Sequence, residues 1–461
     1  MTFMKRFFIL MAVMATAVMV SAQDMMMAPA VTVSDQVSLD GTVTIDEIQA
    51  EGPAFIVIHR DNGEGSFGEV IGFRQVNTGA SYNVAVPIDT TMATTTLYAM
   101  LHEDTGEAGV YEFGMVEGAD SPVIVDGAPV TPAFNAEIVR AYDQLSDGNS
   151  VTIADVVTNQ DGWIVIHADN EGAPGPVLGQ TMVMAGSNSD ITVELSGDVT
   201  TTLFPMLHVD TGEAGVYEFG TVEGADGPVV VNGTVATFPI NAGTPSMRVP
   251  DQIVTDSVMA ESVVSEGEGW LVIHADNDGA PGPVIGQTLV NAGTNLDVVV
   301  EVDPAGVTPV LFPMLHVDTG EAGVYEFGTV EGADGPVTVD GNVVVFPINA
   351  APFITYEGSI EDSTVTVASA GIDAQGWLVI HADNDGAPGP VLGQTPLVPG
   401  VSENITIELE GDITETLFPM LHYDTNEAGV YEFGAVEGAD GPVTVGESVV
   451  TGPMMPSSMM E

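Results

Sequence analysis

The amino-acid sequence predicts an all-β protein made of four tandem immunoglobulin-like β-sandwich repeats, each about 107 residues long. Two sequence blocks, each built around one histidine, recur four times along the chain, which is typical of a repeat architecture. Short β-branched runs alternate with clusters of Gly and Pro, as strands alternate with turns. No window shows the 3.6-residue apolar period of a helix. A small closed β-barrel is the alternative for each repeat.

The strands of one repeat can be located in order. Apolar, β-branched runs predict strands at 151–157, 163–167, 191–195 and 203–208. Segment 228–238 predicts a hairpin around Asn232-Gly233, because this pair tolerates the positive φ that a tight turn needs. The connections between repeats are short and contain Pro, which restricts movement between them. We therefore expect four domains arranged as a semi-rigid rod.

The two histidine blocks define the repeat boundaries. The first block is found at 162–177, 269–284 and 376–391, with a weaker copy from Ala54, and its histidines are His59, His167, His274 and His381. The second block begins at Leu203, Leu311 and Leu417, with an altered copy from Leu97, and its histidines are His102, His208, His316 and His422. These eight are all the histidines of the chain. The predicted domains are 31–136 (divergent), 138–241, 248–349 and 353–451, followed by a disordered tail at 452–461.

The composition excludes several classes of function. The 461 residues include 66 acidic against 6 basic groups, and no cysteine. Without cysteine there is no disulfide, no thiolate nucleophile and no Cys-bound metal. A formal charge of −60 argues against nucleic-acid and anionic-lipid partners, because both need a basic face. Since 45% of the residues are hydrophobic and only 16% are charged, the chain is expected to fold.

Residues 1–22 show the three parts of a secretory signal peptide. Lys5 and Arg6 precede an apolar run at 7–20, and Ser21-Ala22 supplies the small residues of a cleavage site. An uncleaved membrane anchor is the alternative, although the run is short for a bilayer span. The protein is therefore predicted to be secreted or on the cell surface, extracellular or periplasmic, with no membrane span in its mature part.

Acidic residues follow both histidine blocks and suggest a Ca²⁺ site. Carboxylate oxygens on Gly-rich loops are the ligands that Ca²⁺ takes. If the two histidine strands are neighbours, their acids are expected to converge at one end of the sandwich. The candidate ligands are Asp169, Glu171, Asp210, Glu213, Asp276, Asp278, Asp318, Glu321, Asp383, Asp385, Asp424 and Glu427. The alternative is that these are turn residues that bond to their own backbone, while the histidines tie down loop carbonyls.

A second metal hypothesis uses methionine. Met206 and His208 lie two residues apart and so face one way on a strand, and Met100, Met314 and Met420 stand in the same place in the other repeats. A thioether with an imidazole is a donor set for a soft or borderline metal. Packing in a β core is the alternative role for these methionines.

The search for catalytic motifs favours a non-enzymatic protein. The chain has no Gly-x-Ser-x-Gly, no His-Glu-x-x-His and no phosphate-binding loop. A set of His and Asp repeated four times also suits a scaffold better than a catalyst. A secreted hydrolase with a carboxylate pair stays open as the third function.

The order of the two blocks resembles a known family. The run His-Ala-Asp-Asn…Gly-Pro-Val followed by Met-Leu-His-x-Asp-Thr…Tyr-Glu-Phe is similar to domain of unknown function 7282, over nearly the whole mature chain. The resemblance implies an exported, acidic, multi-copy protein, of the kind found in salt-adapted archaea and some bacteria, and it implies no activity. The first repeat departs most, with Arg60 and the loop at 63–67.

Taken together, the sequence predicts an exported, non-enzymatic cell-surface or extracellular protein with a structural, adhesive or envelope-associated role. Ca²⁺ is the cation expected to stabilise it, and no cofactor is required. The expected partner is a component of the cell envelope or another copy of the chain. The rival prediction is a periplasmic or extracellular metal-binding protein that uses the Met/His pairs.

Overall fold

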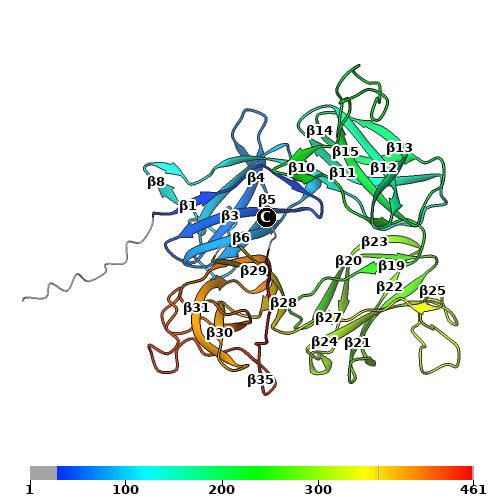
Figure 1. Cartoon of the computed structure of the whole chain (residues 1–461). Coiled ribbons are helices and arrows are strands. Elements are labelled where there is room, and N and C mark those ends of the chain that lie inside the picture. The colour runs from blue at the N-terminus through cyan, green and yellow to red at the C-terminus, as the bar shows by residue number, and fades with distance from the viewer. Residues whose placement is uncertain (1–27, 362, 459–461) are drawn as a thin grey trace, which may run out of the picture.

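The computed structural model describes residues 28–361 and 363–458, and it is built of β-sheet in four repeated units (Figure 1). Two short 3₁₀ turns are the helical elements of this described part. The prediction of an all-β repeat protein is confirmed. The signal peptide predicted at 1–22 lies outside the described residues.

The elements follow each other in chain order. Unit 1 contains β1 (Ala30–Thr32), β2 (Gln36–Ser38), β3 (Thr42–Ala50), β4 (Ala54–Asp61), β5 (Phe67–Val76), β6 (Gly79–Pro87), η1 (Thr90–Met92), β7 (Thr96–Glu103), β8 (Ile124–Val125), β9 (Ala128–Pro129) and β10 (Ala133–Arg140). Unit 2 contains β11 (Ser150–Thr158), β12 (Gly162–Asn170), β13 (Ala173–Val183), β14 (Gly186–Glu194), β15 (Thr202–Val209), β16 (Val230–Val231), β17 (Thr234–Val235) and β18 (Ile240–Asn241).

The second half of the chain repeats this order. Unit 3 contains β19 (Ser246–Arg248), β20 (Ser257–Ser265), β21 (Gly269–Asp276), β22 (Pro281–Val290), β23 (Gly293–Glu301), η2 (Pro304–Gly306), β24 (Val310–Val317), β25 (Thr338–Val339), β26 (Asn342–Val343) and β27 (Ile348–Asn349). Unit 4 contains β28 (Phe353–Glu361), β29 (Thr364–Ile372), β30 (Gly376–Asp383), β31 (Pro388–Leu397), β32 (Gly400–Glu408), β33 (Leu417–Tyr423), β34 (Thr444–Val445), β35 (Ser448–Val449) and β36 (Ser457–Ser458).

Two sheets share one core in each unit, and unit 2 shows how. One sheet has the order β13-β12-β15-β18, and β11 and β14 pair in the other. Ile164 of β12, Leu207 of β15 and Val151 of β11 belong to one buried cluster, so the core lies between the two sheets. Residues 162–168 of β12 are buried without a break, because its second face is covered as well. A strand that is covered on both faces has a continuous run of apolar residues in its sequence. This run is why the strand at 163–167 could be predicted correctly.

The hairpin that Asn232-Gly233 predicts is present. Val231 pairs with Thr234 across the turn, and both turn residues have positive φ, 48° for Asn232 and 84° for Gly233. Asp126-Gly127 and Asp340-Gly341 adopt the same backbone in units 1 and 3. Positive φ at both central positions gives the turn the twist that matches the flanking strands.

A continuous strand joins the first two units. The start of β10, at Ala133, pairs with β7 of unit 1, and its end, at Arg140, pairs with β11 of unit 2. One strand that belongs to both units leaves no flexible link between them. This stiff connection agrees with the restricted movement expected from the short connections.

The predicted rod is wrong, because unit 4 folds back onto unit 1 and closes a ring (Figure 1). The Asn77 side-chain amide donates to the Leu397 carbonyl at 2.8 Å. The Arg74 guanidinium donates to the Val401 carbonyl at 2.7 Å. A cavity of about 540 Å³ at the centre is lined by side chains from all four units, among them Phe238. The composition of a link indicates its stiffness, but not the direction in which it turns the next unit.

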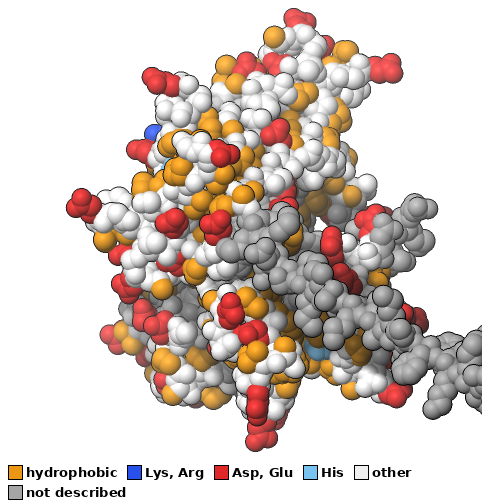
Figure 2. Space-filling view, turned by 90° about the vertical axis from the view of Figure 1, so that its left-hand side faces the viewer, with side chains coloured by type: hydrophobic (Ala, Val, Ile, Leu, Met, Phe, Trp, Pro, Cys, Tyr) orange, Lys and Arg blue, Asp and Glu red, His pale blue; other side chains and the backbone are white. Residues whose placement is uncertain are grey.

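Arginines gather at these junctions. Arg248 and Glu403 line the central cavity, and Arg140 and Arg248 line a second one beside it. Burial lowers the pKa of Arg74 at the unit 1–unit 4 contact, and the charge of Glu403 opposes this shift. Acidic side chains, in contrast, are scattered over the face seen in Figure 2. Three of the four arginines in the described part of this acidic chain, Arg74, Arg140 and Arg248, therefore lie where the units meet, while Arg60 pairs with Glu69 within unit 1.

The tail predicted to be disordered is ordered as far as it is described. Met454 is 1% exposed and exchanges two backbone hydrogen bonds with Leu417. β36 then pairs with β28 in parallel. The prediction of disorder from 452 is therefore wrong for residues 452–458. The apolar side chain of Met454 lies in the core of unit 4 and anchors this otherwise polar segment.

Opening the ring is the first testable consequence. The double substitution Arg74→Ala and Asn77→Ala removes two hydrogen bonds and one positive charge from the contact between units 1 and 4. We expect small-angle X-ray scattering to show a larger maximum dimension than for the unaltered chain, most clearly at low salt, where repulsion is least screened. Asn295→Ala is the control, since its side chain bonds to Asn291 inside unit 3. An unaltered chain with the length of a four-unit rod would contradict the ring.

Candidate functional site: a pair of histidines under a long loop

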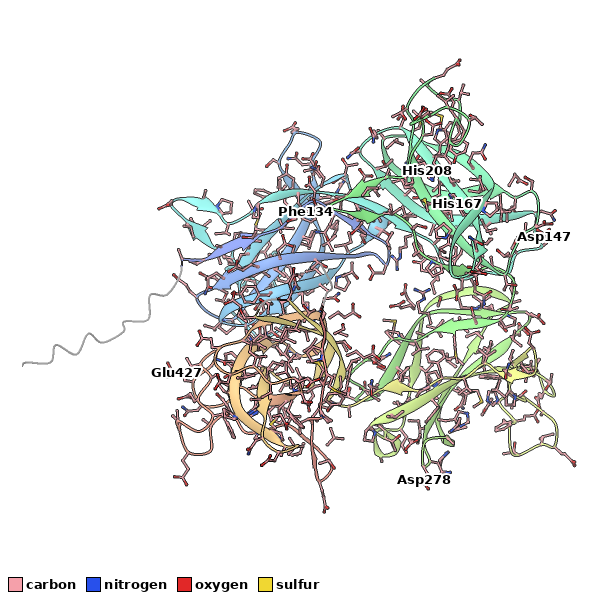
Figure 3. All side chains as sticks on the ribbon, in the orientation of Figure 1. Phe134, Asp147, His167, His208, Asp278 and Glu427 are labelled. Carbon is pink, nitrogen blue, oxygen red and sulfur yellow. The ribbon has the colours of Figure 1, made fainter. Side chains whose placement is uncertain are left out.

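Each unit buries two histidines against each other on the sheet face opposite the core; we call these two residues the histidine pair. In unit 2 they are His167 of β12 and His208 of β15, whose ring centres are 5.7 Å apart and whose planes differ by 25° (Figure 3). The pairs His59/His102, His274/His316 and His381/His422 have ring centres 6.0, 5.8 and 6.0 Å apart. All eight histidines of the chain therefore form four copies of one arrangement.

The register of the two strands explains how the rings meet. Trp163 lies opposite His208, Val165 opposite Met206, and His167 opposite Phe204. Residues directly opposite each other share a face of the sheet, so the two histidines lie on one face, with Val165 and Met206 in the row between them. The register of β12 against β13 shifts on both sides of His167, and the same shift occurs in the other units. A β-bulge of this kind re-aims a side chain along its strand.

Both imidazoles of a pair hold a loop through Nδ1. Nδ1 of His167 lies 2.8 Å from the Gly175 carbonyl oxygen, and Nδ1 of His208 lies 2.7 Å from the Asp226 carbonyl oxygen. A carbonyl only accepts, so Nδ1 carries the proton in both rings. The interpretation that the histidines tie down loop carbonyls is thereby confirmed. A side chain does not fit at Gly175, where a Cβ would stand 2.8 Å from the Cβ of Asn170.

The second nitrogen of each ring, Nε2, forms no hydrogen bond in the described part of the chain. This atom is buried in all eight histidines. His102, His208, His316 and His422 are fully buried, and the other four are 5% exposed. Buried polar atoms nearly always have a partner, so an orphan acceptor repeated eight times needs an explanation.

Burial also sets the charge of the second histidine of each pair. It lowers the pKa of His208 from 6.5 to about 4, while the Asp226 carbonyl opposes the shift and the neighbouring His167 adds to it. The pKa of His102, His316 and His422 is lowered for the same main reason. These rings are therefore neutral near pH 7, with a lone pair on Nε2.

The loop after β15 covers the pair with aromatic rings. Phe219 sets its edge against the His208 ring at 4.7 Å between centres, and Trp163 packs against Tyr217 at 5.5 Å. Phe219 is 37% exposed, so it is the outer wall of the site. Burial raises the pKa of Tyr217 to about 12, so this ring is uncharged too.

A buried aspartate organises the same loop, and the sequence analysis missed it. Asp226 is fully buried and accepts backbone N–H groups from Thr211 at 2.8 Å and from Glu218 at 2.5 Å. Its own carbonyl holds His208, as described above. Asp120, Asp334 and Asp440 do the same in the other units. Each of the four is the last residue of a run Glu-Gly-Ala-Asp, and this repeated run was a signal that could have found them.

The predicted calcium ligands occupy turns. Asp169 accepts the Gly172 N–H at 2.9 Å, and Asp210 accepts the Gly215 N–H at 2.8 Å. The equivalents Asp276, Asp318, Asp383 and Asp424 accept from Gly279, Gly323, Gly386 and Gly429. Glu171, Asp278 and Asp385 have positive φ in tight turns. Glu213, Glu321 and Glu427 donate their backbone N–H to Glu218, Glu326 and Glu432.

The two acid groups do not converge, so that expectation is wrong. β12 and β15 are neighbours but antiparallel, and Asp169, the second-last residue of β12, therefore lies at one end of the sheet. Asp210 follows β15 at the other end, where its N–H bonds to the Asp161 carbonyl. In Figure 3, Asp278 and Glu427 lie on outer loops of units 3 and 4. Among the described residues no group of three or more His, Asp or Glu side chains is placed to hold a metal ion. Calcium binding by either group alone stays a prediction.

Comparison with known proteins identifies the family. The family described as a domain of unknown function (DUF7282) matches residues 29–137, 137–241, 245–350 and 354–455. The chain belongs to this family. Each DUF7282 unit therefore contains one histidine pair and one buried aspartate. Within residues 28–361 and 363–458, no helix has the length and apolar character needed to cross a membrane.

Two relatives are surface proteins of an archaeon. Cell surface glycoprotein 2 of Haloarcula hispanica is 26% identical over 343 residues, which cover 70% of this chain and 34% of the relative. Cell surface glycoprotein 1 of the same organism is 29% identical over 286 residues, 58% of this chain and 30% of the relative. The chain thus spans about a third of the length of these relatives. The crystal structure of Salmonella alpha-2-macroglobulin reacted with methylamine aligns with 94% of this chain and 33% of the other chain. The identity is 11% and the TM-score is 0.15.

The buried aspartate can be tested by Asp226→Asn. Asparagine tolerates the positive φ of 49° but has one acceptor oxygen and no charge, so one of the two N–H groups it bonded loses its partner. We expect a loss of about 1–3 kcal/mol in the free energy of unfolding, measured with denaturant. Glu223→Gln is the control, because it removes a charge from an exposed position of the same loop. Equal unfolding curves for the two variants would contradict the role of Asp226.

The low pKa of His208 predicts a pH dependence of stability. As the pH falls from 6.5 towards 4, the unfolded chain gains a proton at His208 and the folded chain does not, so stability is lost in this window. The loss for this group is about 3 kcal/mol at most, and none occurs above the window. Unfolding followed between pH 7.5 and 5 at fixed salt should show a shallower slope for His208→Gln. An identical slope would show that His208 does not bear the shifted pKa.

Proposed function

We propose that this protein is an exported, non-enzymatic component of a cell surface, with a structural or adhesive role in the envelope. The observation that carries the proposal is the similarity of 70% of the chain to a cell surface glycoprotein. The signal peptide expected at 1–22 supports export. The immunoglobulin-like form of each unit, with two sheets around one core, belongs to the same proposal, because sandwiches of this kind recur in cell-surface proteins.

The construction of the described part supports a mechanical role. One strand, β10, is shared by units 1 and 2, and the contact between Asn77 and Leu397 joins unit 1 to unit 4. A ring in which each unit contacts two others resists bending better than a row of units joined only by their links. The scattered acidic side chains of the surface keep such a body soluble where salt screens their repulsion (Figure 2).

Calcium as a stabilising cation remains part of the proposal. One carboxylate oxygen of Asp210 and of Asp318 is buried without a hydrogen-bond partner among the described residues. Burial raises the pKa of the equivalent Asp424, and the charges of Asp440 and Glu432 add to the rise, although the Gly429 N–H and the Trp377 side chain oppose it. A cation at this turn would neutralise the crowded charges. These oxygens favour the second-block acids over the first-block acids as ligands.

Surface location is tested by protease treatment of intact cells of the native host. We expect external protease to remove the full-length chain, and we expect a chain without residues 1–22 to stay inside and be protected. A cytoplasmic protein followed in the same samples shows that the cells stayed intact. Protection of the unaltered chain would overturn the proposal.

Calcium is tested by thermal unfolding of the full chain in high salt, first with a chelator and then with Ca²⁺ or Mg²⁺ added. A ligand that binds only the folded state raises the midpoint, by an amount set by its concentration and affinity. We expect Ca²⁺ to raise it more than Mg²⁺, and Asp318→Asn to reduce the rise. Asp340→Asn is the matched control, since it sits in the hairpin turn of the same unit. No rise with either ion would exclude a stabilising calcium site.

A further inference from the structure

The orphan Nε2 atoms of the histidine pairs are not explained by a structural role. The scaffold uses only Nδ1, which fastens the loop carbonyls. Holding a carbonyl needs only the Nδ1 donor, and a buried acceptor without a donor costs stability. Instead each unit buries two such acceptors side by side. The inference drawn from them is independent of the surface role proposed above.

The anchoring of the two Nδ1 atoms indicates on which side of its ring each Nε2 lies. Gly175, which holds Nδ1 of His167, belongs to β13, on the outer side of β12. Asp226, which holds Nδ1 of His208, precedes Pro228, which pairs with His208 on the outer side of β15. Both Nδ1 atoms are thus anchored away from the strand pair. Since the two nitrogens of an imidazole point outward in widely different directions, this anchoring leaves each Nε2 on the side of the other ring.

The spacing of the rings suits one shared ion. An imidazole nitrogen binds zinc at about 2.0–2.1 Å, which puts a metal about 3 Å from the ring centre. Ring centres 5.7–6.0 Å apart leave room for a single ion between two such nitrogens. Two facing lone pairs repel each other, and a cation between them removes that repulsion.

A third donor lies in the same place in every unit. Met206 occupies the row between the two histidines on the same face, and its side chain is 6% exposed. Met100, Met314 and Met420 have the same register in units 1, 3 and 4. The opposite residues in this row are all valines, so no carboxylate shares it. Thioether and imidazole without carboxylate favour Cu⁺ over hard cations such as Ca²⁺.

We propose that each DUF7282 unit binds one Cu⁺ between the Nε2 atoms of its histidine pair, with the methionine sulfur as third ligand. The chain then holds four ions, at His59/His102/Met100, His167/His208/Met206, His274/His316/Met314 and His381/His422/Met420. Unit 1 belongs with the others, since Phe55 and Tyr98 replace Trp163 and Phe204 but all three donors are kept.

The ion has a route to the site. The phenylalanine against the second histidine is partly exposed in every unit, from 37% for Phe219 to 43% for Phe433. It is followed by Gly220 or its equivalents, which have positive φ near 75°. We expect an ion to enter by rotation of this side chain.

The test is a titration of the purified full-length chain with Cu⁺ under anaerobic conditions, in competition with a chromophoric chelator such as bicinchoninate. We expect four Cu⁺ per chain, and three for His208→Gln. Met206→Leu is expected to weaken one of the four sites. Glu223→Gln is the matched control and keeps four, because it lies at an exposed position of the same loop but outside the site. X-ray absorption should report nitrogen and sulfur ligands.

A second measurement does not depend on any variant. In the unaltered chain with ¹⁵N-labelled histidine, NMR should show protonated Nδ1 and unprotonated Nε2, and Cu⁺ should shift the Nε2 signals. Fewer than one Cu⁺ per chain, four ions retained by a folded His208→Gln chain, or Nε2 signals that do not move would each overturn the proposal. Binding of Zn²⁺ at these histidines with no binding of Cu⁺ would overturn the choice of ion. None of these outcomes bears on surface location.

Discussion

The fold and the site both depend on one antiparallel strand pair per unit that is buried on both faces. In unit 2 this pair is β12 and β15, whose inner face, with Ile164 and Leu207, forms the core. Its outer face carries His167 and His208 under the loop. Because water reaches neither face, every polar group there needs a partner. The imidazole Nδ1 atoms find theirs in loop carbonyls, so the same strand pair fastens the loop and positions the histidine pair.

Charge decides where the units can meet. A chain with a formal charge of −60 and six basic residues repels itself, and a ring brings its units closer than a rod would. Three arginines lie at the centre of the ring or at its closing contact, where they offset this repulsion: Arg74, Arg140 and Arg248. Much of the remaining acidity faces outward, where salt of about 1 M reduces the range of repulsion to about 3 Å. Ring closure is therefore linked to the salinity in which the protein works.

The two ends of the strand pair and its middle carry different kinds of metal-binding side chain. Carboxylates such as Asp169 and Asp210 lie in turns at opposite ends, where hard cations can approach from solvent. The middle holds only imidazole and thioether donors beneath aromatic rings. The chain can thus keep its scaffold and its candidate metal site on the same two strands, because neither uses the donors of the other.

The sequence by itself determined what depends on neighbours along the chain. It located the repeats, the apolar strands and the Asn232-Gly233 turn, since alternation and positive φ are local properties. It also predicted that the histidines hold loop carbonyls. Only the tertiary structure decided what depends on contacts through space: the separation of Asp169 from Asp210, the burial of Asp226, the place of Met454 in the core, and the closure of the ring. A strand's residues specify the face they bury, but the direction of its partner and the packing of whole units arise from contacts between residues far apart in the chain.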